Sequence, residues 1–206
     1  MKGKLIPTRG FSTVHCSQTT SRGFTLVELM VVVALTVIVI TLAAPSFQRM
    51  IESQRLQSIN SQLVTDLQFA RSESATRNAY VRVTFRSNAS GTCYSLYTYT
   101  NNATQCDCRN ATPCTAAGLV EIKTVQVKSD TKVQVRPQGG QPIEFAFEPI
   151  TGALYKVPTD FISPPLTQYT IRTFIDSERA LNTIVGLAGR PSVCAPAGSK
   201  MQVQAC

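Results

Sequence analysis

The sequence predicts an α+β protein in which one long N-terminal helix packs on an antiparallel β-sheet domain with disulfide-bonded loops. The first observation is a long segment without helix breakers, because no glycine lies between Gly23 and Gly91 and no proline between Pro45 and Pro113. The second is a change after Arg77 to short alternating segments that are separated by turn residues. Several short strands after one helix are typical of a sheet that packs on that helix.

Residues 24–44 form the first half of the predicted helix and are mostly apolar, with Glu28 as their only ionisable side chain. About 20 residues at about 1.5 Å each span the hydrocarbon core of a bilayer, so we expect this segment to cross a membrane. The leader before it is basic, contains no acid and ends at Gly23. No small-residue cleavage site closes the apolar segment, so we expect it to be retained. By the positive-inside rule the domain after it lies outside the cytoplasm.

Glu28 is an unusual residue for such a segment. A carboxylate inside a membrane span costs about 2.5–3.5 kcal/mol on insertion scales, and it normally has a partner and a function. Its position alone also permits a simpler interpretation, in which the carboxylate is shallow enough to reach the lipid headgroups.

Residues 45–78 form the second, amphipathic half of the predicted helix, which we expect to run from Thr25 to about Thr76. Apolar residues recur there at helical steps: Phe47, Met50, Ile51, Leu56, Ile59, Leu63, Leu67 and Ala70. The opposite face is polar and includes Asp66. The predicted strands are 80–85, 93–99, 119–127, 132–136, 143–147, 169–175 and 180–185.

Cysteine usage predicts an oxidising compartment. One of the seven cysteines, Cys16, lies in the leader, and the remaining six form an even set: Cys93, Cys106, Cys108, Cys114, Cys194 and Cys206. We expect Cys194 to bond Cys206, and Cys93 to bond either Cys106 or Cys108, with the other bonding Cys114. A zinc site at Cys106, Cys108 and Cys114 is the alternative, which the absence of C-x2-C pairs disfavours. We expect neither a metal nor a cofactor.

The residues that most enzymes use for acid–base chemistry are scarce. The only histidine, His15, lies in the leader, so a chain without the leader has none. This excludes Ser-His-Asp and Cys-His arrangements and H-E-x-x-H zinc sites, and no phosphate-binding glycine loop occurs. The leader carries four of the cations, so its removal lowers the formal net charge from +8 to +4. We expect a protein that is not an enzyme.

The segment Gly23-Phe24-Thr25-Leu26-Val27-Glu28 resembles the class III signal of type IV pilins and type II secretion pseudopilins. The resemblance implies that a prepilin peptidase cuts between Gly23 and Phe24 and methylates the new N-terminus. It implies that Glu28 is the assembly carboxylate, which faces the N-terminal amine of a neighbouring subunit. The expected partners are therefore this peptidase, other pilin or pseudopilin subunits and inner-membrane lipid.

The rest of the chain resembles the GspH/FimT minor pilins. The similar segments are residues 66–75 (DLQFARSESA), residues 147–152 (FEPITG), and Gly189-Arg190 with Cys194 and Cys206 near the C-terminus. Arg71 and Glu73 in the first segment are expected to be surface charges. The predicted organisation is a cleaved leader 1–23, a membrane or filament-core helix 24–44, an amphipathic helix 45–78 and a periplasmic domain 79–206. The predicted function is a minor subunit of a type IV pilus or a type II secretion pseudopilus, and the sequence does not distinguish the two.

Binding of duplex DNA during natural transformation is the alternative function, because some FimT-type pilins bind DNA. Their DNA-binding end carries G-R-x-R, whereas Gly189-Arg190-Pro191-Ser192 keeps only the first arginine. Affinity for duplex DNA comes largely from cations that contact phosphates. The candidate cations are Arg172, Arg179, Arg190 and Lys200.

Overall fold

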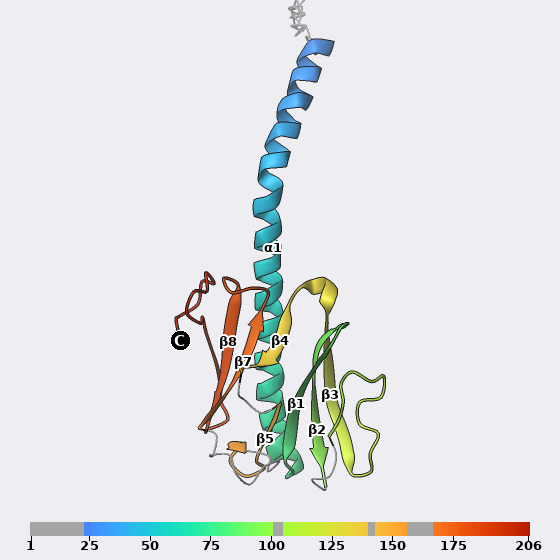
Figure 1. Ribbon diagram of the computed structural model, residues 1–206, viewed down its shortest axis with the longest axis vertical. Coiled ribbons are helices and arrows are strands. Elements are labelled where there is room, and N and C mark those ends of the chain that lie inside the picture. Colours follow the sequence, from blue (N-terminus) through green and yellow to red (C-terminus); the bar gives the residue numbers. More distant parts are fainter. Residues whose placement is uncertain (1–22, 101–104, 140–142, 156–166) are drawn as a thin grey trace, which may run out of the picture. The chain divides into compact units, whose positions relative to one another are not determined.

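The computed structural model describes residues 23–100, 105–139, 143–155 and 167–206 (Figure 1). The predicted leader therefore lies outside the described residues, except for Gly23. The chain divides into two compact units, Met1–Pro45 and Ser46–Cys206.

The predicted long helix is confirmed as α1, which spans Leu26–Arg77 and has 52 residues. Its bounds differ by one residue at each end from the predicted ones. In the first unit the apolar side chains of α1 are exposed all round the helix, as expected of a segment that contacts lipid or other helices. Among the described residues, α1 is the one helix whose length and composition would allow it to cross a membrane.

The predicted antiparallel β-sheet domain is confirmed, and its strands form two sheets. The first has the order β3-β2-β1-β5-β6, with β1 Val81–Asn88, β2 Gly91–Tyr99, β3 Leu119–Lys128, β5 Glu144–Phe147 and β6 Leu154–Tyr155. The second has the order β4-β7-β8-β9, with β4 Gln134–Pro137, β7 Gln168–Phe174, β8 Ala180–Gly186 and β9 Pro191–Cys194.

The chain changes sheets at a short 3-10 helix, η1 Ser129–Thr131. Lys132 follows it with a left-handed φ of 60° and turns the chain from the edge strand β3 to the edge strand β4. The sequence also failed to predict β6 and β9. The first has only two residues, and the second begins with Pro191 at the edge of its sheet, where proline is tolerated.

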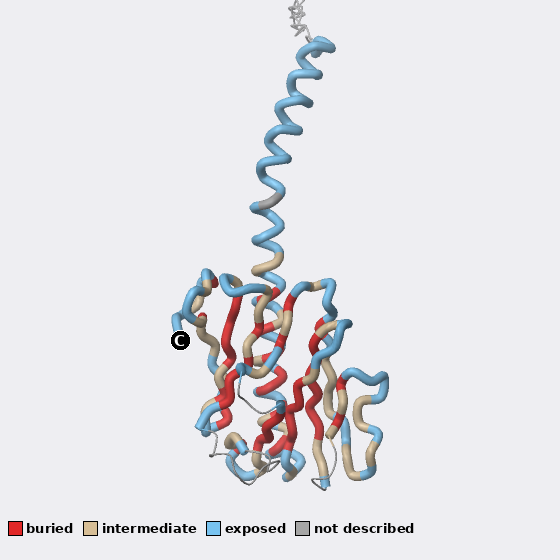
Figure 2. Tube along the Cα trace, viewed as in Figure 1, coloured by how far each residue is buried: buried red, intermediate tan, exposed pale blue. Residues whose placement is uncertain are grey.

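The core lies between α1 and the inner faces of both sheets, where Figure 2 shows most of the buried residues. The helix contributes a fully buried stripe that consists of Leu56, Leu63, Leu67 and Ala70. The sheets meet through aromatic rings, since the ring of Phe145 on β5 lies 4.4 Å from that of Tyr169 on β7. Burial begins only at Leu56, so the predicted apolar positions Phe47, Met50 and Ile51 are exposed instead.

Two buried polar residues also join α1 to the sheets. The Asn60 side chain accepts a 3.0 Å hydrogen bond from the Thr183 hydroxyl on β8. Asp66, predicted to lie on the solvent-facing side, is buried instead. Its carboxylate accepts hydrogen bonds from the Tyr94 hydroxyl at 2.8 Å and from Lys123 Nζ at 2.6 Å. These donors compensate for its burial, and burial with the nearby Asp66 charge raises the pKa of Tyr94.

The turn between β5 and β6 packs backbone to backbone on the turn between β8 and β9. Leu154 N donates to Leu187 O at 2.8 Å. Gly189 has a left-handed φ of 70°, and a Cβ placed there would lie 1.9 Å from Gly152 O. Position 189 therefore requires glycine for its conformation and for this close approach.

Replacing Gly189 with alanine should lower the free energy of unfolding by roughly 2–4 kcal/mol, because strain in the left-handed region adds to a backbone collision. The matched control is Gly186→Ala, since a Cβ at position 186 meets nothing within 4 Å and no left-handed φ is needed there. The control should change stability by less than about 0.5 kcal/mol. Urea unfolding of the full chain in detergent measures both, and equal effects would contradict the proposed contact.

Candidate functional site

The predicted processing site lies in exposed backbone just before the helix begins. Gly23 is exposed and outside α1, and the Phe24 side chain is 81% exposed. Thr25 caps the helix, since its hydroxyl oxygen accepts the backbone N–H of Glu28 at 3.2 Å. The Gly23–Phe24 peptide bond is therefore not covered by other described residues.

Glu28 lies in the first turn of α1, where a carboxylate interacts favourably with the helix dipole. Thr25-x-x-Glu28 has the spacing of a capping box, a signal that was present in the sequence but was missed. The Glu28 side chain is exposed and makes no ion pair with the described residues. In a nonpolar environment its carboxylate would thus need a partner from another molecule.

The six cysteines of the globular unit form three disulfides, Cys93–Cys108, Cys106–Cys114 and Cys194–Cys206. The first two select one of the two pairings that the sequence had left open. Bonded sulfurs are not available as thiolate ligands, which removes the basis for the zinc alternative. Asp107 and Arg109 pair within the same loop, and this hydrogen-bonded pair lowers the pKa of Asp107 to about 2.

A buried charge on β1 was missed by the sequence analysis. Arg82 is only 1% exposed, its Nη1 lies 4.0 Å from the Glu144 carboxylate, and its guanidinium stacks over the Tyr99 ring at 3.8 Å. Glu144 also accepts a 2.7 Å hydrogen bond from Gln105 Nε2. These contacts hold the loop after β2 on the sheet, which indicates a structural role for Glu144.

The four candidate DNA-contacting cations do not form one basic face. Arg179 precedes β8, and Arg190 follows it beside β9. A strand of seven residues therefore separates them, or about 20 Å. Arg172 lies on β7 with its guanidinium 5.4 Å from the Phe174 ring. Lys200 belongs to the end that carries Arg179, because Lys200 N donates to Glu178 O.

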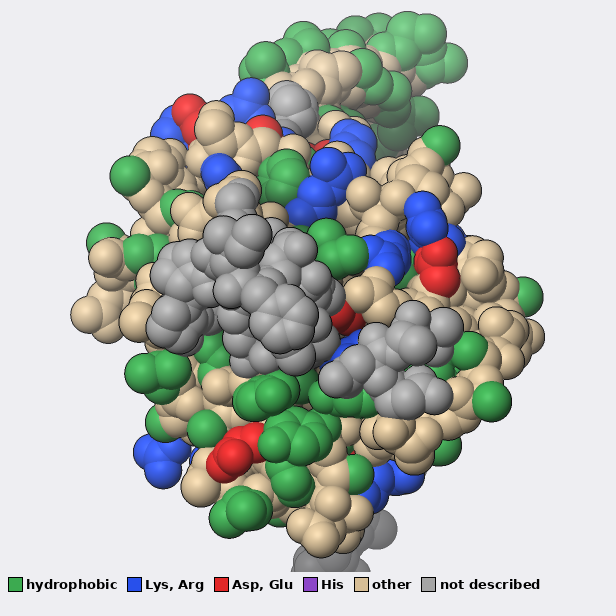
Figure 3. All heavy atoms as spheres, turned by 60° about the horizontal axis from the view of Figure 1, so that its bottom comes forward, with side chains coloured by type: hydrophobic (Ala, Val, Ile, Leu, Met, Phe, Trp, Pro, Cys, Tyr) green, Lys and Arg blue, Asp and Glu red, His purple; other side chains and the backbone are tan. Residues whose placement is uncertain are grey.

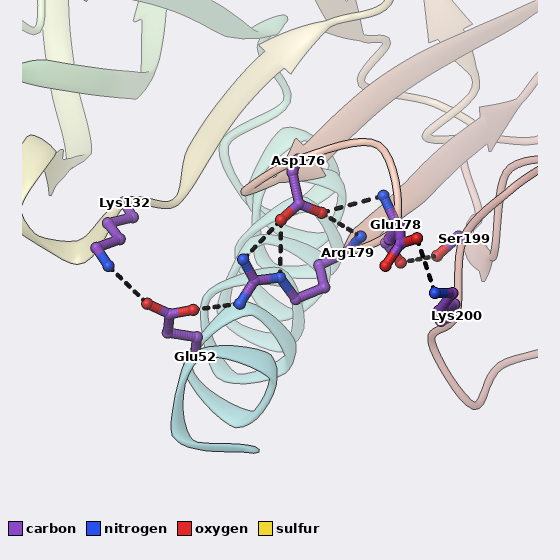
Figure 4. A network of polar contacts seen from close by, with 7 residues as sticks. All are labelled: Glu52, Lys132, Asp176, Glu178, Arg179, Ser199 and Lys200. Atoms are coloured by element: carbon purple, nitrogen blue, oxygen red, sulfur yellow. Dashed lines mark hydrogen bonds and ion pairs between the residues drawn. The ribbon is translucent and has the colours of Figure 1, made fainter. Parts of the chain in front are cut away.

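The charges at that end are largely neutralised by ion pairs (Figure 4). Arg179 donates to Asp176 at 2.6 and 2.9 Å and also to Glu52 of α1. Lys200 Nζ lies 2.7 Å from a Glu178 carboxylate oxygen. Glu52 accepts a further hydrogen bond from Lys132 Nζ at 2.8 Å. Glu52 therefore joins α1 to the connection before β4 and to the turn before β8.

Arg71 is not the surface charge that the sequence predicted. Its Nε donates to Gly152 O at 3.1 Å, and its Nη2 donates to Thr151 O at 3.2 Å. It thereby fixes the β5–β6 turn on α1. Glu73 is paired with Arg77 at 2.6 Å, one helical turn away. Beside Arg71 lies an open hollow of about 530 Å³, lined by α1, by this turn and by Arg190-Pro191.

Two protein families match this chain, one in the globular unit and one at the N-terminus. The family described as "Type II transport protein GspH" matches residues 60–157, which cover the buried half of α1 through β6. The family described as "Prokaryotic N-terminal methylation motif" matches residues 19–44, which include Gly23, Phe24 and Glu28. No curated protein matches the chain.

One solved structure is similar, that of the type IV minor pilin FimU of Pseudomonas aeruginosa (strain PAO1). The two chains are 16% identical over 68% of this chain and 88% of that one, with a TM-score of 0.46.

The Glu52 contacts predict a specific acid sensitivity. Hydrogen bonds from Lys132 and Arg179 lower the pKa of Glu52 below its ordinary value of 4.5. A carboxylate with a lowered folded-state pKa stabilises the fold above its unfolded pKa, and this stabilisation is lost as the pH falls through the folded value. The difference in unfolding free energy between wild type and Glu52→Gln should therefore be largest near neutral pH and shrink below about pH 4.5.

The control is Glu121→Gln, since Glu121 is exposed on β3 and makes no ion pair with the described residues. Its difference from wild type should stay small at every pH. Urea unfolding at several pH values between 3 and 7 measures both variants, and a pH-independent effect of Glu52→Gln would contradict the ion-pair explanation.

Proposed function

From the two family matches, which support a GspH/FimT-like pilin, we propose that this chain is a minor structural subunit of a type IV pilus or a type II secretion pseudopilus. In this proposal a prepilin peptidase removes residues 1–23, and residues 24–44 cross the inner membrane. Residues 45–78 form the amphipathic helix, and residues 79–206 form a domain in the periplasm. The subunit later leaves the membrane and joins a filament.

The observation that carries the proposal is the order of features at the N-terminus. The methylation motif covers residues 19–44. Within it an exposed Gly23–Phe24 bond precedes an exposed apolar helix. Such a helix requires lipid or other apolar helices around it. Once the subunit leaves the lipid, the packed helices of a filament core would surround this helix instead.

Glu28 supports assembly rather than simple anchoring. Cleavage after Gly23 would create a positive amine on Phe24, and the described residues offer the Glu28 carboxylate no ion pair. The amine of a neighbouring subunit would satisfy the carboxylate, whose insertion without a partner costs about 2.5–3.5 kcal/mol. The three disulfides favour an exported domain, because disulfides persist in oxidising compartments.

Binding of duplex DNA is the second candidate function. It is favoured by Arg190, which is exposed and makes no ion pair with the described residues. It is disfavoured by the ion pairs of Arg179 and Lys200 and by their distance along β8 from Arg190. Duplex binding draws its affinity from several phosphate contacts, and Arg190 alone would supply few of them.

The first test is processing. Co-expression with a prepilin peptidase should remove residues 1–23 and leave N-methylated Phe24, as measured by intact-mass spectrometry. Gly23→Leu should block cleavage, because it places a bulky side chain directly before the bond that is cut, where glycine has none. The control Thr25→Ser should still be cut. An N-terminus anywhere after Ala44 would contradict the proposal, because the apolar segment would be lost.

The second test separates the charge of Glu28 from its position in the capping box. Glu28→Gln retains a side chain suited to this position of the box but loses the charge, and Glu28→Ala loses both. If the charge attracts a neighbouring amine, both variants should insert in the membrane as well as wild type, yet their recovery in sheared filaments should fall at least about tenfold. Thr36→Ala, in the same apolar segment, is the control and should assemble normally. Normal assembly of Glu28→Gln would show that the charge is not needed.

A further inference from the structure

The β5–β6 turn exposes an isoleucine at its tip. Ile150 is 85% exposed, the highest value among the large apolar side chains of the described residues. Leu187 in the neighbouring β8–β9 turn is 57% exposed, and the hydrogen bond from Leu154 N to Leu187 O joins the two turns. Figure 3 shows hydrophobic side chains gathered at this end of the globular unit. A patch of exposed apolar side chains is typical of an interaction site.

The turn that carries Ile150 is held rigidly. Glu148 and Gly152 close it through a 3.1 Å backbone hydrogen bond, and the Glu148 carboxylate accepts the Thr151 backbone N–H at 3.0 Å. From the helix side, Arg71 donates to the Thr151 and Gly152 carbonyls, and the Ser74 hydroxyl donates to Glu148 O. A docking residue on such a turn loses little conformational entropy on binding.

The hollow beside Ile150 is lined by two cations, and the Glu148 carboxylate bonds the lining residue Thr151 from the same turn. Its described lining residues include Arg71 and Arg190 and no carboxylate. Arg71 already donates to two carbonyls, whereas Arg190 makes no ion pair with the described residues. The polar side chains of Gln68 and Ser72 line the helix side of the hollow. The hollow therefore suits a carboxylate that approaches Arg190 next to an apolar group on Ile150.

We propose that Ile150 and the hollow beside Arg190 dock a segment of a neighbouring filament subunit that presents a carboxylate next to an apolar side chain. This proposal rests on the proposed function as a filament subunit. A protein segment fits better than duplex DNA, because the surface offers one unpaired arginine beside an apolar tip, whereas duplex binding relies on several phosphate contacts.

The test uses the full chain in a bacterial strain that lacks its own copy. The photoreactive residue p-benzoylphenylalanine replaces Ile150 in one sample and Val120, an exposed residue of β3, in the control. Illumination should crosslink position 150, and not position 120, to a filament subunit. Mass spectrometry should find Asp or Glu beside an apolar residue in the crosslinked peptide.

The charge is tested in the same crosslinking background. Arg190→Glu should lower the crosslinked yield at position 150 about tenfold. Arg190→Lys should retain most of the yield, and the control Lys128→Glu, an exposed cation on β3, should leave it unchanged. Exchanging the partner's acid for arginine should restore the yield with Arg190→Glu. Thermal unfolding checks that Arg190→Glu still folds.

Three outcomes would overturn the proposal. A yield that does not depend on the charge at position 190 would exclude a carboxylate partner. An adduct that nuclease removes would assign the surface to nucleic acid. Absence of a crosslink in a chain that has methylated Phe24 and enters sheared filaments would reject the docking surface alone. A chain that is neither cut nor found in filaments would reject the proposed function as well.

Discussion

The globular unit depends on the burial of one helical stripe by two sheets. No strand ladder joins these sheets among the described residues, so their relative position comes from side-chain contacts such as Phe145–Tyr169 and from the helix that they share. Leu56, Leu63 and Leu67 of α1 are fully buried between them. The stripe also carries specific polar contacts, because Asn60 bonds Thr183 of the second sheet and Asp66 bonds Tyr94 of the first. Hydrophobic burial brings the sheets to the helix, and these buried hydrogen bonds fix their register on it.

The two ends of the globular unit have different chemistry. At one end Glu52 pairs with Lys132 and Arg179, and Asp176 pairs with the same arginine. At the other end Arg71 is used to hold backbone carbonyls, and Arg190 remains exposed beside the hollow. The segments that resemble GspH/FimT proteins, around Arg71, Gly152 and Gly189, meet at this second end. They build a rigid corner, and the residues that project from that corner are those available to a partner.

Local patterns in the sequence predicted the elements better than the contacts between them. The long helix was predicted to within one residue because it contains no glycine and only one proline, Pro45. Strands in which several apolar and polar residues alternate were predicted. The two-residue β6 is too short to show such an alternation. The burial of Asp66 was not predictable locally, because its partners Tyr94 and Lys123 are 28 and 57 residues away. Similarly, Arg179 and Arg190 are close in sequence, yet the intervening strand places them at opposite ends.

The anchors along α1 have a mechanical consequence. Glu52, Asn60, Asp66 and Arg71 each bond a different part of the globular unit, and together they span about 28 Å of helix. Tension along the helix axis loads these contacts in shear and at the same time, so each contact carries only part of the force. A subunit pulled by its helix would therefore resist extraction as one cooperative unit, and its rupture force would depend more on the number of anchors than on the strongest of them.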